Sequence, residues 1–277
     1  MAGVTTLEIA DWRPAVDAAA TQALARALED GGVLELPRLA FVLRDDERRF
    51  LDPRWSDARA KNIALDRGHV HGTRAAGADR EALAAMIARF ARDASGLIAA
   101  LLPRYAPHLK AARTSFRPQP ASGRAVSWRK DDTRLHVDAF PSRPNYGERI
   151  LRVFSNVNPD GVARVWRVGE PFEAMAAHFL PRIRRMRAGE ATVLAALHVT
   201  KGRRSEYDHL MLGLHDAAKA DLDYQRASAQ REVTFAPGTT WICFSDQGLH
   251  AVIGGQYMFA QTIHLPLAAL YEPALAP

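Results

Sequence analysis

The stretch "TRLHVDAFPSRP", residues 133–144, decides how the second half of the chain is interpreted. Its first eight residues are rich in β-forming types. In a strand, successive side chains point to opposite faces, so Leu135 and Val137 would share one face and His136 and Asp138 the other. The sequence therefore predicts a short strand that presents an imidazole and a carboxylate side by side.

The His-x-Asp pair alone is a weak signal. Ten histidines and 31 acidic residues would produce about one such pair by chance. Its position on a strand gives it weight, because an unpaired charge inside a sheet costs several kcal/mol. A metal ion would remove that cost. Two imidazoles and one carboxylate on one side of Fe(II) leave three positions open for substrate and oxygen, so we expect a third ligand from another histidine.

The best candidate for the third ligand is His250, in "SDQGLHAVIGGQY", at the start of a late strand. His264, on the final strand, is the second choice. Three histidines in helical contexts are poorer candidates: His198, His209 and His215. His69 and His71 share the i, i+2 spacing, but we interpret "RGHVHGT" as a loop.

Composition predicts an ordinary globular protein. The chain has 277 residues, of which 48% are hydrophobic and 25% charged. Its net charge of +6 favours anionic partners without choosing among them. The one cysteine, Cys243, excludes an intramolecular disulfide and a cysteine-based zinc site, and we expect it to be buried in a strand.

No targeting or spanning segment is visible. The first twenty residues lack the basic and apolar regions of a signal peptide, and no run of 18 apolar residues occurs. We therefore expect a cytoplasmic location.

Periodicity divides the chain into a helical and a β-rich part. Residues 13–30 and 79–105 predict helices, and short β-like runs separated by turn residues begin after residue 113. A helical stretch at about 170–227 interrupts the strands. GxGxxG and Walker patterns are both absent. We therefore predict an α+β fold in one domain, 1–277, with a mainly helical part, 1–112, and a barrel-like β core, 113–277, that carries the helical insertion.

Three stretches resemble one enzyme family. "LHVDAFPSRPNYGERILRVFSNVNP" (135–159), "CFSDQGLHAVIGGQYMFAQTIHLP" (243–266) and "WSDARAKNIALD" (55–66) are similar to 3-deoxy-D-manno-oct-2-ulosonic acid (Kdo) hydroxylases. The resemblance implies a double-stranded β-helix (jelly-roll, cupin-like) core and iron ligands at His136, Asp138 and His250. It also implies an Fe(II)-dependent reaction that uses 2-oxoglutarate and O2 to hydroxylate C3 of the Kdo sugar in lipid A or a precursor.

The sequence departs from the wider dioxygenase superfamily at one point. Many members hold the distal carboxylate of 2-oxoglutarate with an arginine on the final strand, but residues 260–264, "AQTIH", contain none. An arginine fork binds a carboxylate through two charge-assisted hydrogen bonds. We therefore expect Arg152 of "RILRVF" to be the anchor. The other candidate cosubstrate residues are Arg149, Asn156, Gln261 and Thr262.

Kdo carries a carboxylate and lies near phosphates in lipid A, so a basic mouth is expected. The candidate residues are Arg117, Lys130, Arg134 and Arg143. The lipid-anchored substrate also suggests peripheral contact with the inner membrane. No nucleic-acid partner is expected.

Two alternatives remain open. The missing late arginine favours a cupin-like metal enzyme that does not use 2-oxoglutarate. The high pI of about 9.8 is compatible with a non-catalytic protein that binds nucleic acid or anionic lipid. However, the sequence has no helix-turn-helix, zinc-finger or stacked-aromatic signature.

Overall fold

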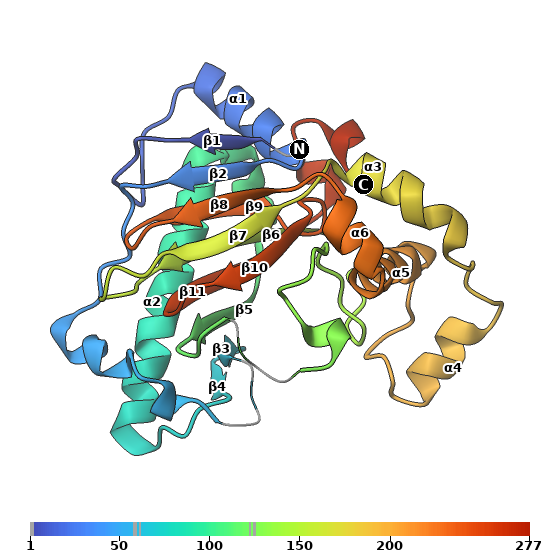
Figure 1. Ribbon diagram of the computed structural model, residues 1–277. Helices are drawn as coiled ribbons and strands as arrows, with labels where there is room; N and C mark the ends of the chain where they lie inside the picture. Colours follow the sequence, from blue (N-terminus) through green and yellow to red (C-terminus); the bar gives the residue numbers. More distant parts are fainter. Residues whose placement is uncertain (1–2, 58–59, 61, 122, 124–125) are drawn as a thin grey trace.

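The computed structural model describes residues 3–57, 60, 62–121, 123 and 126–277. In this part of the chain, eight strands form a large sheet and three form a small one (Figure 1). The large sheet has the order β1-β2-β9-β6-β11-β5-β3-β4, and the small sheet β10-β7-β8. The strands are β1 (Val4–Thr6), β2 (Val33–Leu36), β3 (Ile63–Asp66), β4 (His69–His71), β5 (Lys110–Arg117), β6 (Arg149–Asn156), β7 (Arg164–Val168), β8 (Arg231–Phe235), β9 (Thr240–Phe244), β10 (His250–Gly254) and β11 (Met258–Leu265).

The helices lie mostly outside the sheets. They are α1 (Ala18–Glu29), α2 (Gly77–Leu101), α3 (Phe172–Phe179), α4 (Glu190–Ala196), α5 (Glu206–Ala220) and α6 (Leu222–Ala227). The prediction for residues 79–105 is confirmed, although the α-helix ends at Leu101 and Pro103 starts a 3-10 turn. The first helix starts later than predicted, because Asp17 caps it by accepting a 2.8 Å hydrogen bond from the Ala20 amide.

The long helix α2 covers one face of the large sheet (Figure 1). Its apolar stripe, including Met86 and Phe90, packs with Phe259 and Ile263 of β11. This is the burial that a 3.6-residue period predicts. Strand β11 is hydrogen-bonded to β5 on one side and β6 on the other, so the last strand lies inside the sheet.

The small sheet packs against the opposite face of the large one. An aromatic cluster fills the space between them, and Trp166 contacts both Phe154 and Trp241 with ring centroids 5.1 and 5.6 Å apart. Cys243 lies in this cluster on β9 and is buried, as predicted. The two sheets therefore form a sandwich, and the candidate site lies at one end of its interior.

Helices α3, α5 and α6 form a second layer. They enclose a separate apolar cluster that includes Leu135, Val137 and Leu249. This layer backs the segment that was predicted to carry the metal ligands.

The loop prediction for His69 and His71 is wrong. Residues 69–71 form strand β4, which pairs with β3 in a tight hairpin, and both histidines are exposed.

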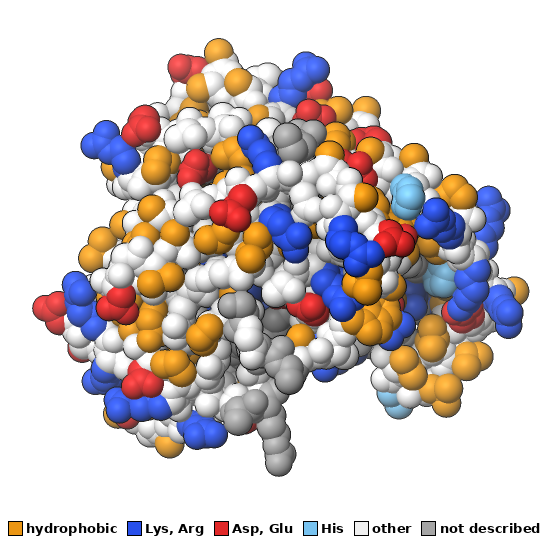
Figure 2. Space-filling model, in the orientation of Figure 1, with side chains coloured by type: hydrophobic (Ala, Val, Ile, Leu, Met, Phe, Trp, Pro, Cys, Tyr) orange, Lys and Arg blue, Asp and Glu red, His pale blue; other side chains and the backbone are white. Residues whose placement is uncertain are grey.

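Basic side chains are spread over the surface, with a group at the right edge of Figure 2, over the region of α3 to α5. Among the described residues, no helix has the combined length and apolar character that crossing a membrane requires.

Candidate metal centre

The segment with His136 and Asp138 is extended and lies beside β10. The His136 amide donates to the His250 carbonyl and the His250 amide donates to the His136 carbonyl, both at 2.9 Å. The predicted strand is reduced to this single bridge, because the Asp138 amide donates instead to the Ser245 carbonyl at 2.7 Å. The prediction that these residues form a strand is therefore wrong.

The predicted alternation of side chains is nevertheless confirmed. Leu135 and Val137 are fully buried in the cluster with α3, α5 and α6. His136 and Asp138 face the other way, into a pocket that they share with His250. The helical layer therefore fixes one face of the segment and leaves the other for chemistry.

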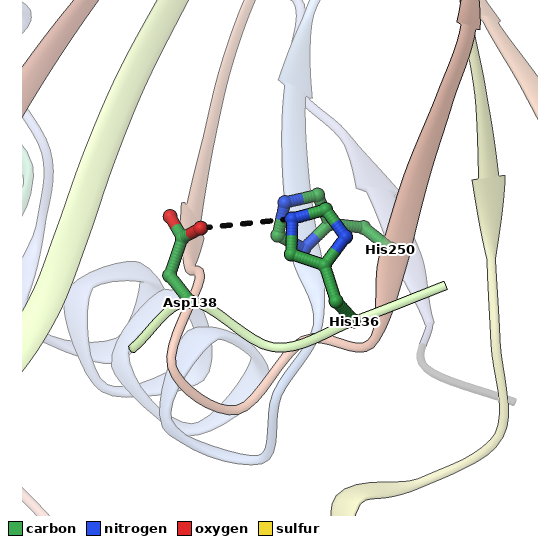
Figure 3. Close-up of side chains that lie close together, drawn as sticks. All are labelled: His136, Asp138 and His250. Atoms are coloured by element: carbon green, nitrogen blue, oxygen red, sulfur yellow. Dashed lines mark ion pairs between the residues drawn. The ribbon is translucent and has the colours of Figure 1, made fainter. Parts of the chain in front are cut away.

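The structure brings the three predicted ligands together. One ligand atom each from His136, Asp138 and His250 lies within 4.8 Å of the others (Figure 3). Asp138 Oδ1 is 3.7 Å from His136 Nε2, and the two imidazole centroids are 4.6 Å apart. Two side chains come from the extended segment and one from the start of β10.

Backbone carbonyls orient both imidazoles. His136 Nδ1 lies 2.7 Å from the Arg134 carbonyl, and His250 Nδ1 lies 2.8 Å from the Gly248 carbonyl. A carbonyl only accepts, so each Nδ1 carries the hydrogen and each Nε2 keeps its lone pair. This tautomer is the one that a metal-binding histidine needs. The donor set therefore fits a divalent transition metal.

Burial and charge set the protonation of the cluster. Burial lowers the pKa of both His136 and His250, so both are neutral near pH 7. Burial by itself would raise the pKa of Asp138, but the Arg152 guanidinium outweighs it and holds that pKa well below its usual value. Two neutral imidazoles and one carboxylate are the protonation states that bind Fe(II).

Two aromatic rings outside the triad contact its histidines. Trp166 stacks on His250 with centroids 4.9 Å apart, and His215 meets the ring of His136 edge-on at 5.5 Å. His215, a poorer candidate ligand because of its helical context, lies outside the three-residue cluster. Its Nδ1 is 3.0 Å from Asp216 Oδ1.

The triad lines a pocket of about 100 Å³. Arg117 and Arg152 line both this pocket and a much larger cavity of about 920 Å³. The remaining residues around the smaller pocket are Asp132, Phe154, Trp166, Val252 and Met258. The centre is therefore buried at the end of an open cavity.

Two predicted cosubstrate residues reach this space. Arg152 Nη1 donates to Asp138 Oδ2 at 2.6 Å, so the guanidinium lies directly beside the ligand cluster. Thr262 is the register partner of Arg152 on β11 and lines the large cavity with it.

The other three predicted cosubstrate residues lie elsewhere, and the geometry gives them no support. Arg149 is fully buried and donates to Asp246 and Gln247. Gln261 faces the opposite side of β11 and bonds to Thr114. The side-chain Nδ2 of Asn156 donates to the carbonyls of Val162 and Phe235, where it holds a loop.

Sequence reasoning missed Arg164 as a site residue. Arg164 and Arg117 line a small pocket next to the metal pocket. Burial and the Arg117 guanidinium lower the pKa of Arg164 to about 9, and its Nε has no hydrogen-bond partner among the described residues. The signal was available, since "ARVWRV" places Arg164 and Trp166 on one strand face just as "RILRVF" places Arg152 and Phe154.

The remaining candidates are dispersed. His264 lines the large cavity with its ring centroid 6.0 Å from that of Phe140. Arg143 also lines this cavity, whereas Lys130 lines the small pocket beside Arg164. Arg134 pairs with Asp131 and lies in none of these pockets.

A buried pair of imidazoles with one carboxylate defines the class of proteins with a 2-His-1-carboxylate metal centre. A family model for 3-deoxy-D-manno-oct-2-ulosonic acid (Kdo) hydroxylase matches residues 11–277. The chain therefore belongs to the Kdo hydroxylase family, as the sequence resemblance predicted.

Solved structures give the same relationship. The chain is similar to the Kdo hydroxylase KdoO, a non-heme Fe(II) α-ketoglutarate (2-oxoglutarate) dependent dioxygenase, in complex with cobalt(II). The TM-score is 0.96 and the identity 45%, over 99% of this chain and 93% of that one. For KdoO with α-ketoglutarate and Fe(III), the TM-score is 0.95 and the identity 44%, with the same coverage. A comparison with curated proteins found no match.

Proposed function

We propose that the protein is an Fe(II)- and 2-oxoglutarate-dependent dioxygenase that hydroxylates C3 of the Kdo sugar in lipid A or a lipid A precursor. The observation that carries this proposal is the buried cluster of His136, Asp138 and His250 at the end of a basic cavity. Membership of the Kdo hydroxylase family supports the choice of substrate.

His136, Asp138 and His250 would hold the iron. Bound Fe(II) supplies the redox centre at which O2 and the cosubstrate react. The chain itself orients the two imidazoles through the Arg134 and Gly248 carbonyls and holds the carboxylate with Arg152. Burial of the cluster restricts water around the oxidant.

We propose that the positive charges of three arginines, Arg152, Arg164 and Arg117, compensate the negative charges of the two carboxylates of 2-oxoglutarate. Arg152, beside Asp138, stays the predicted anchor, with Thr262 next to it. Arg117 adds a guanidinium in the metal pocket, and Arg164 adds one in the small pocket beside it. A dianion there would offset the unfavourable burial that depresses the pKa of Arg164.

We propose that the sandwich is a double-stranded β-helix within a single domain, 1–277. In this proposal the N-terminal part, 1–112, supports the core, 113–277, and the helices of residues 170–227 are an insertion. The two facing sheets and the bridge between His136 and His250, which extends the small sheet toward the site, support it.

We propose peripheral contact with the inner membrane through α4 and its flanks. Val193, Leu197 and Val199 are 56%, 68% and 53% exposed, and "RIRRMR" (182–187) lies just before α4. Exposed apolar side chains beside basic ones favour an anionic lipid surface, where each basic residue contributes about 1 kcal/mol.

The membrane proposal predicts that the protein floats with vesicles that contain phosphatidylglycerol and not with neutral ones. The double variant Val193→Asp/Leu197→Asp should lose flotation. Leu222→Asp is the control, because Leu222 is 52% exposed on α6, outside the patch. Flotation of the double variant at the wild-type level would contradict this contact.

The proposed activity is tested by aerobic incubation of iron-loaded protein with 2-oxoglutarate and Kdo-lipid A. We expect the sugar to gain the mass of one oxygen, with one succinate per hydroxylated sugar and no reaction without 2-oxoglutarate. Oxygen gain without 2-oxoglutarate would favour the cupin-like alternative, and no gain at full iron loading would refute the proposed function.

A further inference from the structure

A side pocket of about 440 Å³ lies beside the β3–β4 hairpin. It shares six lining residues with the large cavity: Asp66, Arg67, Arg143, Pro144, Tyr146 and Lys201. The large cavity in turn shares Arg117 and Arg152 with the metal pocket. The large cavity alone is near the upper end of the ~300–1,000 Å³ that enclose a drug-sized ligand. The side pocket therefore provides more space than one sugar next to the metal needs.

Cations outnumber carboxylates around this space. The large cavity is lined by six basic residues and two acidic ones: Arg67, Arg113, Arg117, Arg143, Arg152, Lys201, Asp66 and Glu148. Asp66 lies 3.2 Å from Arg143 and 3.5 Å from Arg113, so two guanidiniums share one carboxylate. Among the described residues, no carboxylate forms an ion pair with Arg67 or Lys201. The side pocket therefore has an excess of positive charge.

The backbone of Arg67 points to a role for its side chain. Arg67 and Gly68 join β3 to β4 between the paired residues Asp66 and His69, and both have positive φ, 51° and 81°. Two-residue hairpins of this kind strongly prefer Asn or Gly at the first position. An arginine in the left-handed region costs about 1–2 kcal/mol. The turn itself does not need this arginine, whereas an anion site does.

Tyr146 is the second strained residue of the pocket. Its φ is 55°, and Asp208 holds the loop by accepting from the amides of Asn145 and Tyr146 at 2.9 and 3.1 Å. A Cβ on Gly202 would lie 2.4 Å from the Tyr146 hydroxyl, so a larger residue at position 202 would displace the end of the phenol side chain. Two non-glycine residues with positive φ in one pocket are typical of a binding site. The ring, 61% exposed, offers an apolar face next to Lys201.

We propose that Arg67, Arg143 and Lys201 form a second anion subsite, which binds a phosphate or carboxylate group of the acceptor beyond the sugar that is hydroxylated. This inference rests on the proposed function. The subsite makes the protein selective for an acceptor with at least two anionic groups. Lys201 follows closely on Val199 of the exposed apolar patch, which suits an acceptor presented from a lipid surface.

The test measures equilibrium binding of Kdo-lipid A in detergent, without 2-oxoglutarate, so that no turnover is needed. The double variant Arg67→Asn/Lys201→Gln should bind at least 10-fold more weakly than the wild type. Arg67→Asn suits the hairpin turn, so its melting temperature should not fall, and weaker binding would not reflect unfolding. Arg38→Gln is the control for loss of one surface charge, because Arg38 lies outside these pockets.

Two further acceptors identify the anionic group. If the group is a phosphate, dephosphorylated Kdo-lipid A should bind the wild type as weakly as intact acceptor binds the double variant. If it is a carboxylate of a second sugar acid, dephosphorylation should leave the affinity unchanged. For the Kdo methyl glycoside, which has one anionic group, the loss of affinity in the double variant should be much smaller than the loss for intact Kdo-lipid A.

Equal binding of intact Kdo-lipid A by the wild type and the double variant, or no binding by either, would overturn the subsite. A wild type that binds Kdo-lipid A more tightly than the double variant but adds no oxygen to it would support the subsite and contradict the proposed hydroxylase function.

Discussion

Asp138 contacts both the arginine and a histidine of the candidate metal centre. One carboxylate oxygen is 2.6 Å from Arg152 Nη1, and the other faces His136 Nε2 at 3.7 Å. The ion pair keeps the carboxylate ionised in a buried place and leaves one oxygen directed at the candidate metal position. Arg152 therefore positions a ligand in addition to any contact with the cosubstrate.

Replacing Arg152 tests its role as anchor. Arg152→Ala should raise the apparent KM for 2-oxoglutarate at least 10-fold and raise the KM for the sugar acceptor much less, because a charge-assisted hydrogen bond contributes about 1.5–3 kcal/mol. Steady-state kinetics with each substrate varied separately would show this split. Equal increases in the two KM values would argue against the anchor.

The buried imidazoles predict how stability depends on pH. Burial lowers the pKa of His136, His250 and His264 in the folded protein, whereas a histidine in the unfolded chain titrates near 6.5. Below about pH 6.5 the unfolded state therefore binds more protons than the folded state. The stabilising effect of neutral burial is complete above that pH and is lost as the pH falls.

We expect the free energy of unfolding of the metal-free protein to decrease between pH 7.5 and 5.5, by up to about 1.4 kcal/mol per pH unit for each imidazole that stays neutral. Urea unfolding at both pH values measures it, and His136→Gln should make the dependence shallower. The same slope in the variant and the wild type would contradict the contribution of His136.

The sequence predicts which residues of a strand share a face, but it does not predict which of the two faces points into the sandwich. Alternation placed Arg149 and Arg152 on opposite faces of one strand, and the structure agrees. Which face points into the sandwich depends on how β6 pairs with β9 and β11, which no local pattern encodes. Arg149 was therefore an equally regular candidate, although it is paired with Asp246 on the other side.

The extended segment 133–140 is an unusual element, because a helix replaces one of its neighbouring strands. Gln225 of α6 accepts from the Leu135 amide at 2.7 Å and donates to the Leu135 carbonyl at 2.9 Å. A side-chain amide thus makes the pair of hydrogen bonds that a neighbouring strand would make. The residue after Leu135 is the first metal ligand, so Gln225 helps to position His136.

Gln225→Leu should lower the free energy of unfolding by about 1–3 kcal/mol, since it leaves a buried peptide group without partners. It should also weaken Fe(II) binding, because the segment is then held mainly by β10. Urea unfolding and an anaerobic metal titration measure the two effects. Gln256→Leu, which loses one hydrogen bond to the Pro118 carbonyl, is the control and should leave Fe(II) affinity unchanged.

The strands that sequence analysis missed are short. β1, β3 and β4 have three or four residues each, too few for alternation to stand out. Their stability comes from partners far along the chain, such as the pairing of β3 with β5. By contrast, the eight-residue strands β6 and β11 have enough alternating positions for prediction.

At the scale of the whole molecule, the site exists because distant segments are brought together. The sheet order places β11 between β5 and β6, and β10 next to the segment of His136. The sequence supplied the three ligands through a motif and a resemblance. It did not supply Arg164, because its place in one small pocket with Arg117 appears only in the folded structure.

The central claim is that one ferrous ion is held by two histidines and one aspartate. Anaerobic dialysis against Fe(II), followed by metal analysis, tests it most directly. We predict one iron per chain for the wild type and for Arg38→Gln, and loss of bound iron in His136→Ala and in His250→Ala, with both variants still folded by circular dichroism. Full iron content in either histidine variant would contradict the account.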